Sequence, residues 1–501
     1  MSAEPSGAPV RFVGFDSGGE VFLNQGRVLR GIYPGNGALY RKVLHACEAH
    51  DLFRFGIVAT RELHVNPYPD LPYDLVLEHE RIPFISYPHE WPASMLKAAA
   101  LFHIDLYTEL GRQGLTIKDW HPYNILFKGT EPVFVDFTSI IPTDNLQDEE
   151  YLTPPPILAP LQHLWGTTST YIFEMYWLMF VPYFLLPLYL MQRGRYQQAR
   201  RRMLETTLNA SRSVLRKPEV FAGICPARLS YDVNLLLKML ALLDRRPLKP
   251  HFWRIVRGEV RCLNVSVTKS NYTAYYKAKE EELAFEPSQS WTNKQAVIYE
   301  VIRQLKPATV LDVASNTGWF SVLAAKQGCQ VVAFDVDEAC MNVLYAQAKR
   351  EQLPILPLVV DLTNLTPDVF PLEYEDEKHS LIGGEFPLLL ATEKRLSCDM
   401  VLALGIIHHM ALGQNQSFAQ IAQLLSALSK KYLVLEFVPR DDRLIVSELA
   451  FFPALKSRPN GFDWYTQENL ILELKRHFQS IKVTKSFPDA RTILICSKGH
   501  K

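Results

Sequence analysis

The sequence has no excess of charge of either sign, because Lys and Arg total 53 and Asp and Glu also total 53. Beyond the Arg-rich run 198–203 there is no concentrated basic stripe, which argues against a nucleic-acid partner. The seven cysteines are scattered and form no CxxC pair, so a disulfide framework or a cysteine zinc site is not expected. Together with an N-terminus that has no apolar signal core, this predicts a reducing, cytoplasmic location.

Long uncharged runs are also rare, and the exception is Met175 to Met191, which carries no charge over 17 residues. As a straight helix it would span about 25 Å, short of the roughly 30 Å hydrocarbon core of a bilayer. Pro182 and Pro187 would also interrupt such a helix. The run therefore predicts a buried helix pair, with a membrane-associated segment as the alternative.

The pattern of apolar residues changes along the chain and predicts four regions. Residues 1–150 mix short strands with a helix over 90–114, and a hairpin is expected with its turn at Asn24 to Gly26. Residues 151–264 are mainly helical, and 265–290 form a polar, aromatic connector. From 291 to 501 strands and helices alternate, which predicts a doubly wound α/β domain.

The turn after the first strand of this α/β domain lacks the GxGxxG pattern of dinucleotide sites. In its place the chain reads Asp312-x-Ala314-x-Asn316-x-Gly318, with Ser315 inside the turn and a helix from Trp319 to about Gln327. An acid at Asp312 would repel a pyrophosphate but can orient an ammonium group. The turn contains no basic residue, so it favours a sulfonium cofactor without phosphates.

Acidic residues also end the later strands, where ligands of open parallel sheets bind. Asp335, followed by Val336, ends the second strand and is suited to accept hydrogen bonds from ribose hydroxyls. Asp361 and Leu362 end the third strand beside the expected adenine edge. The fourth strand is expected to end near His408 and His409, and the fifth at Glu436.

These motifs, in this order and spacing, resemble class I S-adenosylmethionine-dependent methyltransferases, and more narrowly the nodulation-associated methyltransferase group. The resemblance implies a Rossmann-like fold, methyl transfer, and S-adenosyl-L-methionine as cofactor. By position it assigns Asp312, Ala314, Asn316 and Gly318 to the first cofactor loop, Asp335 to the ribose, and Asp361 with Leu362 to the adenine. The chain departs from the family at Ala314, which stands in place of the usual first glycine of the loop.

Three residues are candidates for catalysis: His408, His409 and Glu436. A histidine with a pKa near neutrality can remove a proton from a hydroxyl or amine acceptor. The alternative is that one histidine caps a strand end while the other packs against the sheet. Glu436 can reach the pocket or bind only backbone.

The N-terminal half contains a second motif, in which Asp119, Asn124 and Asp136 follow the order of a kinase catalytic loop and its metal ligands. The form Asp-x-His-Pro-x-Asn resembles small-molecule kinases, which predicts an α+β kinase-like region with a helical second half. A Gly-rich phosphate loop is missing, and Arg30 is the nearest candidate for the expected lysine. No metal site is therefore predicted, and Asn124 and Asp136 are its nearest candidates. Alternatively, Asp119 and Asp136 brace the loop by pairing with Lys118 or Lys128.

The leading hypothesis is a methyltransferase acting on a small-molecule or glycan-type acceptor. A bifunctional protein with an added small-molecule kinase activity and a non-catalytic S-adenosylmethionine-binding module are the alternatives. The sequence names neither the acceptor nor the oligomeric state.

Overall fold

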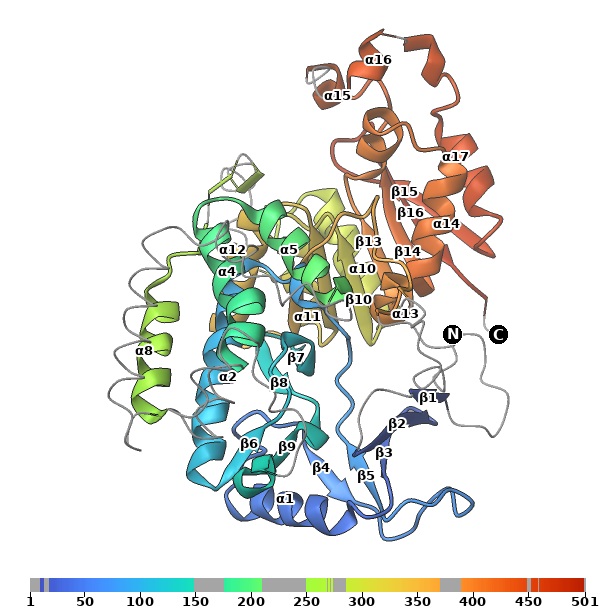
Figure 1. Cartoon of the computed structure of the whole chain (residues 1–501). Helices are drawn as coiled ribbons and strands as arrows, with labels where there is room; N and C mark the ends of the chain where they lie inside the picture. The colour runs from blue at the N-terminus through green and yellow to red at the C-terminus, as the bar shows by residue number, and fades with distance from the viewer. Residues whose placement is uncertain are drawn as a thin grey trace. The chain divides into compact units, whose positions relative to one another are not determined.

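The structure is a computed structural model that describes residues 10–12, 18–147, 175–209, 249–267, 269–270, 272–273, 285–369, 389–447, 452–457 and 459–499. The chain divides into two compact units (Figure 1). The first contains residues 1–83, 87–127 and 132–266, and the second contains 84–86, 128–131 and 267–501. The described residues of the predicted regions 1–150 and 151–264 fall largely within the first unit, whereas residues 151–174 and 210–248 lie outside the part of the chain that the structure describes.

The first unit contains a five-stranded antiparallel sheet in the order β1-β2-β3-β5-β4, two small two-stranded sheets, and helices. The expected hairpin is confirmed, because β2 and β3 pair and the residue pair Gln25-Gly26 turns with positive φ. The elements of this unit are β1 (Val10–Phe12), β2 (Gly19–Asn24), β3 (Arg27–Ile32), α1 (Gly37–Ala49), β4 (Thr60–Glu62), β5 (Leu75–His79), α2 (Ala93–Arg112), β6 (Leu115–Ile117), β7 (Ile125–Lys128), β8 (Glu131–Phe134), β9 (Ile140–Pro142), α4 (Leu186–Gln192), α5 (Tyr196–Asn209) and α8 (Lys249–Cys262).

The uncharged run near residue 180 forms a π-helical segment, Met175–Leu185, that continues directly into α4. Pro182 lies inside the π-helical segment and Pro187 lies just after its junction with α4, so both prolines stand within one continuous helical run and do not divide it into the predicted helix pair. Phe180, Phe184 and Leu188 are fully buried, which confirms the predicted burial. Among the residues that the structure describes, no helix combines the length and apolarity needed to cross a membrane.

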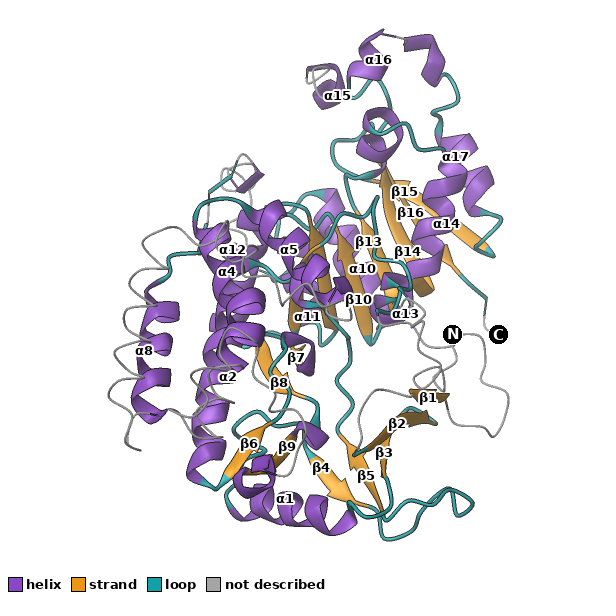
Figure 2. Ribbon diagram, viewed as in Figure 1, coloured by secondary structure: helices purple, strands orange, loops and turns teal. Residues whose placement is uncertain are grey.

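The second unit is built on a seven-stranded sheet in the order β12-β11-β10-β13-β14-β16-β15 (Figure 2). The neighbouring strands β12, β11, β10, β13 and β14 are parallel to one another, whereas β16 runs antiparallel to both β14 and β15. The elements of this unit are α10 (Asn293–Leu305), β10 (Thr309–Val313), α11 (Trp319–Lys326), β11 (Gln330–Asp335), α12 (Glu338–Glu351), β12 (Ile355–Val359), α13 (Thr392–Leu396), β13 (Cys398–Ala403), α14 (Phe418–Leu428), β14 (Ser429–Phe437), α15 (Arg443–Ser447), α16 (Pro453–Ser457), α17 (Gln467–Leu474), β15 (Ser480–Lys485) and β16 (Thr492–Ser497).

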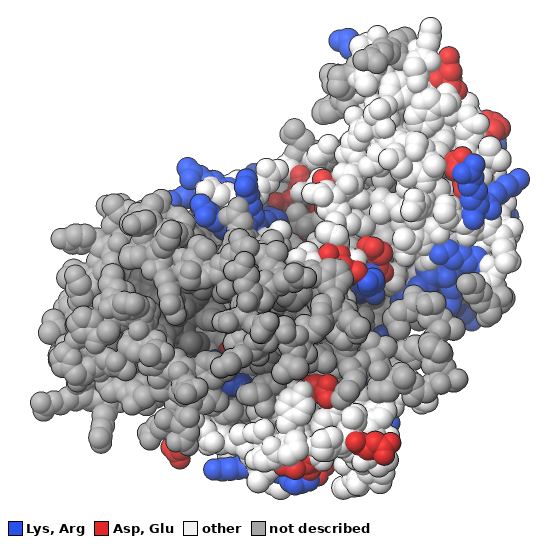
Figure 3. All heavy atoms as spheres, turned by 45° about the vertical axis from the view of Figure 1, so that its right-hand side comes forward, with Lys and Arg blue, Asp and Glu red and all other residues white. Residues whose placement is uncertain are grey.

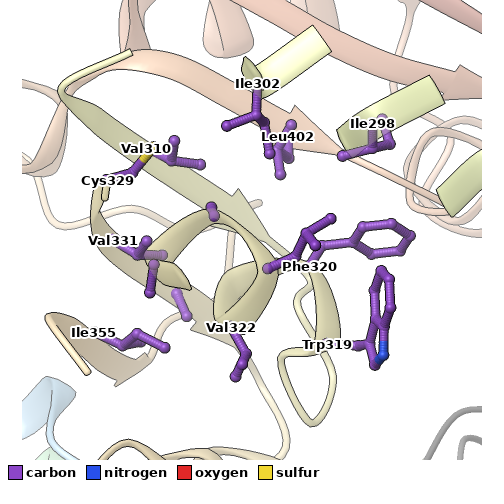
Figure 4. Close-up of a cluster of buried hydrophobic side chains, with 14 of the residues drawn as sticks. Ile298, Ile302, Val310, Trp319, Phe320, Val322, Cys329, Val331, Ile355 and Leu402 are labelled. Atoms are coloured by element: carbon purple, nitrogen blue, oxygen red, sulfur yellow. The ribbon is translucent and has the colours of Figure 1, made fainter. Parts of the chain in front are cut away.

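The strand order reverses direction at β10, which creates a switch point between β10 and β13. Because crossovers between parallel strands are right-handed, α11 and α12 cover one face of the sheet and α14 the other. The central strands are mostly apolar and buried on both faces, as expected for parallel strands, and the acids Asp312 and Asp399 are exceptions among them. Figure 4 shows one side of this core, where Trp319 and Phe320 at the start of α11 lie near Ile298 of α10.

Candidate functional site

The candidate site lies at the edge of the second unit's sheet where the parallel strands end. Strand β10 ends at Val313, β11 at Asp335, β13 at Ala403 and β14 at Phe437. Since all of these strands are parallel, the segments that follow them gather at one edge. The switch point between β10 and β13 makes this edge the expected ligand position.

The first loop adopts a left-handed backbone at three alternate residues: Ala314 (φ 54°), Asn316 (φ 53°) and Gly318 (φ 83°). At Gly318 a side chain would also collide, since an added Cβ would lie 2.5 Å from Leu344. The loop is tied to the next strand by the Ser315 N–H, which donates to the Phe334 carbonyl at 2.8 Å. The departure at Ala314 therefore concerns backbone conformation as well as bulk, because a left-handed alanine carries strain that a glycine avoids.

Asp312 is almost fully buried and accepts a hydrogen bond from the Ser321 hydroxyl at 2.6 Å. Burial raises the pKa of its carboxyl to about 7, although the Ser321 hydrogen bond and the charge of Lys294 act in the opposite direction. Within the described part of the chain, no cation lies at ion-pair distance from Asp312. A bound cation would complete the surroundings of this carboxylate.

Asp335 fixes the first loop to the end of β11. Its Oδ2 accepts the backbone N–H of Asn316 at 2.8 Å, and its Oδ1 accepts the N–H of Asp337 at 2.9 Å. Burial raises the pKa of this carboxyl, and these two backbone hydrogen bonds oppose the shift. Val336 beside it is exposed.

The hydroxyl of Ser315 supports the fit of this loop to a polar ligand. Its Oγ is buried without a hydrogen-bond partner among the described residues, a state that normally carries a free-energy cost. A cofactor with donor and acceptor groups would satisfy it.

Asp361 and Leu362 lie just beyond the third strand, which ends at Val359 and so is two residues shorter than expected. The backbone N–H of Val360 donates to the Asp335 carbonyl at 3.0 Å, which brings this segment beside the end of β11. Leu362 is buried, whereas Asp361 is exposed and accepts hydrogen bonds from its neighbour Thr363.

His408 and His409 lie in the helical turn after β13, which ends at Ala403 rather than near the histidines. Their ring centroids are 4.2 Å apart, and the His409 ring stacks on buried Phe452 with centroids 5.4 Å apart. Burial and the charges of His409 and Arg491 lower the pKa of His408 to about 3. The His408 imidazole is therefore neutral near pH 7 and a weak base, unlike the histidine of near-neutral pKa that the catalytic prediction required.

Glu436 is the last residue but one of β14 and is completely buried. Its Oε2 lies 2.9 Å from the Lys294 ammonium, and its Oε1 accepts the Ser486 hydroxyl. The Glu436 carboxylate is therefore bound by two side chains, whereas the alternative prediction was that it binds only backbone groups.

Sequence reasoning missed several polar contacts in this region. One of them is the ion pair of Lys294 with Glu436. A sequence feature that could have indicated a partner for Lys294 is its position in the first turn of a helix, where the helix dipole disfavours cations. Another is Asp442, which is buried and pairs with Arg491 at 2.8 Å across 49 residues. No local sequence pattern predicts the contact between Asp442 and Arg491.

In the first unit the kinase-like residues do come together. The Asn124 amide donates to the Asp119 carbonyl, and His121 Nε2 lies 3.1 Å from Asp119 Oδ2. Burial opposes ionisation of Asp119, but the charge and hydrogen bonds of His121 outweigh it and lower the pKa of the carboxyl. Asp119 thus pairs with His121 and not with Lys118.

Asp136 is held by donors of the protein itself. Arg30 of β3 lies 3.2 Å from its Oδ1, which also accepts the Thr138 hydroxyl, while Ser139 donates to Oδ2. Arg30 thus stands on the third strand, where kinases carry their lysine, and faces the candidate metal ligand. In the described part of the chain, no three His, Cys, Asp or Glu side chains gather as a metal site would require.

The fold and loop of the second unit define a Rossmann-like α/β protein. No protein-family model matches the chain. It is similar to the nodulation protein NoeA of Rhizobium meliloti (strain 1021), with 27% identity over 415 residues that cover 78% of this chain and 75% of NoeA. This confirms the predicted resemblance to the nodulation-associated group.

Among solved structures, the chain is similar to the bifunctional kinase-methyltransferase WbdD, with 19% identity and a TM-score of 0.27 over 43% of this chain. The match covers 40% of WbdD, so the chain spans less than half the length of that protein. It is also similar to the magnesium protoporphyrin IX methyltransferase ChlM of Synechocystis PCC 6803, with 14% identity and a TM-score of 0.27 over 46% of this chain and 93% of ChlM.

Proposed function

We propose that the chain is an S-adenosylmethionine-dependent methyltransferase that acts on a small-molecule or glycan-type acceptor. The observation that carries this proposal is the Asp335 carboxylate, which ends β11 and holds the first loop through the Asn316 N–H. Asp312, at the start of the same loop, supplies a second buried acid without a cation at ion-pair distance in the described chain. Two acids at adjacent strand ends suit a cationic nucleoside.

Two features disfavour the dinucleotide alternative. The loop has an acid and no basic residue where a pyrophosphate would sit. The sheet also departs from the parallel 3-2-1-4-5-6 order of dinucleotide folds, because antiparallel β16 occupies the place beside β14.

We propose that different residues at this edge of the sheet bind different parts of the cofactor. We assign the ammonium of the cofactor to Asp312, its ribose to Asp335, and its adenine to the segment of Asp361 and Leu362, with Val336 alongside. Ser315 would donate its unpaired hydroxyl to the same ligand. When bound, S-adenosylmethionine supplies a methyl group on a sulfonium centre.

For the acceptor, we propose that His408 binds the acceptor group, because its Nδ1 has no hydrogen-bond partner among the described residues, whereas its lowered pKa makes the imidazole too weak a base to remove a proton well. His409 is held by its stack on Phe452 and would orient His408. For Glu436 we propose anchoring of Lys294 in place of proton transfer, since its two oxygens are bound by Lys294 and Ser486.

The acceptor class rests on charge. Among the described residues on the face that Figure 3 displays, charged side chains of both signs stand in groups among uncharged ones. Such a mixed surface suits a small or uncharged acceptor better than a polyanion.

For the first unit we propose a kinase-like scaffold without phosphoryl transfer. A magnesium ion at Asp136 would have to compete with Arg30, Thr138 and Ser139 for the two carboxylate oxygens. The kinase alternative is favoured only by the convergence of Asp119, Asn124 and Asp136.

The proposed function is tested by calorimetric titration of the full chain with S-adenosylmethionine, followed by incubation with labelled cofactor and extracts of the native host. We expect saturable binding and a product that is 14 mass units heavier than an extract component. Binding without any labelled product would favour the non-catalytic module, and no binding would end the proposal.

A further inference from the structure

The stretch that the sequence predicts to be a connector reaches the first cofactor loop within the second unit. The main stretch of this unit begins at Val267, and the structure describes residues 269–270 and 272–273 there, which we call the entry segment. The Ser270 N–H donates to the Thr273 hydroxyl at 2.9 Å, and the Thr273 N–H donates to the Ser270 hydroxyl at 3.1 Å. This reciprocal pattern is that of a helix N-terminal cap, and it gives the entry segment a defined backbone conformation.

Asn316 of the first loop binds the entry segment with its side chain. Its Nδ2 donates to the Tyr272 carbonyl at 3.2 Å, while its Oδ1 accepts the backbone N–H of Thr317 at 2.6 Å. The backbone N–H of Asn316 donates to the Asp335 carboxylate at 2.8 Å. Both ends of the Asn316 amide are thus bonded within the protein, and the side chain joins the entry segment to the loop.

Tyr272 is exposed at the point where the entry segment meets the loop. It is 53% exposed, whereas its neighbour Thr273 is 3% exposed. Val336, which follows Asp335, is also exposed. The Asn316–Asp335 hydrogen bond therefore has an exposed residue with a large apolar side chain next to each end. Single exposed apolar side chains are ordinary, but two beside the same pair of site residues suit a ligand with a flat apolar group.

The contacts of Tyr272 favour the adenosyl group of the cofactor over its methionine end. Asn316, which binds Tyr272, is bonded to Asp335, the residue that we assign to the ribose. Asp312, which we assign to the ammonium, is bonded to Ser321 of α11. An aromatic side chain can stack on a nucleobase, and that contact does not require a charge on the ligand.

We propose that Tyr272 is a cofactor-binding residue: held on the first loop by the Asn316 amide, it covers the adenosyl group of the bound cofactor. This inference rests on the proposed function, because it assumes that an adenosyl compound binds at Asp335. It gives the connector a part in binding, and it gives the Asn316 side chain the task of holding Tyr272.

The test is calorimetric titration of the full chain with S-adenosylmethionine and with S-adenosylhomocysteine, which has the same adenosyl group but no sulfonium charge. We expect Tyr272→Ala to lower the affinity for both compounds about tenfold. Tyr272→Phe should keep the wild-type affinities, because stacking requires the ring and not the hydroxyl. The matched control is Phe55→Ala, an aromatic residue of the first unit that is 41% exposed, and it should leave both affinities unchanged.

The outcomes separate this inference from the proposed function. If the wild type binds and Tyr272→Ala binds both compounds equally well, the inference is wrong while the proposed function stands. A loss for S-adenosylmethionine alone would contradict the contact with the adenosyl group and indicate a contact with the sulfonium. If the wild type binds neither compound, the proposed function fails together with the inference.

A second measurement does not depend on affinity. At saturating S-adenosylhomocysteine, amide hydrogen exchange in the peptide that contains residues 267–273 should slow in the wild type, because the covered cofactor holds the entry segment on the loop. The effect should be smaller in Tyr272→Ala at equal saturation. Exchange that is unchanged by saturation of the wild type would contradict the contact.

Discussion

The two units each place a buried or partly buried acid where a ligand is expected, and they differ in what faces it. In the first unit Asp136 is paired with Arg30 and bonded by Thr138 and Ser139. In the second unit Asp312 has a hydrogen bond from Ser321 but no cation at ion-pair distance in the described chain. A side chain that already satisfies an acid removes the need for an external cation, whereas an acid without one retains that need.

The largest expected effect in this comparison is on the second unit. Asp335→Ala removes two hydrogen bonds from backbone N–H groups to a carboxylate, each worth about 1.5–3 kcal/mol, and frees the first loop. We expect S-adenosylmethionine affinity to fall about 100-fold or more in calorimetry. Glu300→Ala, on the exposed surface of α10, serves as the control. Equal affinities for Asp335→Ala and the wild type would remove Asp335 from the site.

The next effect should fall on the stability of the first unit. Arg30→Met leaves Asp136, whose side chain is only 21% exposed, without its cation, and we expect a loss of about 2 kcal/mol in the free energy of unfolding by urea. Arg54→Met breaks an exposed pair with Asp51 and should change stability by less than about 0.5 kcal/mol. Similar losses for both variants would show that the Arg30–Asp136 pair stabilises the first unit no more than an exposed ion pair does.

The Arg30–Asp136 pair also leads to a prediction about nucleotide binding by the first unit. We expect the wild-type chain to show no saturable binding of ATP with magnesium, because the protein's own donors occupy the Asp136 oxygens. Magnesium-dependent binding that Asp136→Ala abolishes would favour the bifunctional alternative.

A smaller effect concerns pH. Because the pKa of Asp312 is raised to about 7, its carboxyl is neutral at lower pH, and cofactor affinity should fall about tenfold per pH unit below that value. Between about pH 4 and 7 the folded chain holds a proton that the unfolded chain releases, so this group lowers the free energy of unfolding as pH rises. Asp312→Asn should flatten both dependences, and a slope that persists would assign them to another group.

The smallest effect is expected at Asp361. This residue is exposed and its side chain bonds to its own neighbour Thr363, so Asp361→Asn should change cofactor affinity by about twofold at most. A loss as large as that of Asp335→Ala would mean that Asp361, too, binds the cofactor directly through its carboxylate.

The sequence predicted what depends on local pattern. The alternation of strands and helices, the loop from Asp312 to Gly318, and the β2–β3 hairpin all follow from periodicity and turn residues. It did not predict the partners of the charged residues, because Lys294 and Glu436 are 142 residues apart and no local rule joins them. For the same reason Arg30 was recognised as a candidate while its pairing with Asp136 was not. The end of the fourth strand was predicted too late, near His408, whereas the strand ends at Ala403. The apolar residues after Ala403 continue the strand pattern, although the chain there enters a helical turn.

The central claim is that the edge of the second unit's sheet binds an adenosyl sulfonium and excludes a pyrophosphate. Parallel calorimetric titrations of the full chain with S-adenosylmethionine and with NAD test this most directly. The account predicts saturable binding of one S-adenosylmethionine per chain and none of NAD under the same conditions. Saturable binding of NAD, or no binding of S-adenosylmethionine, would contradict it.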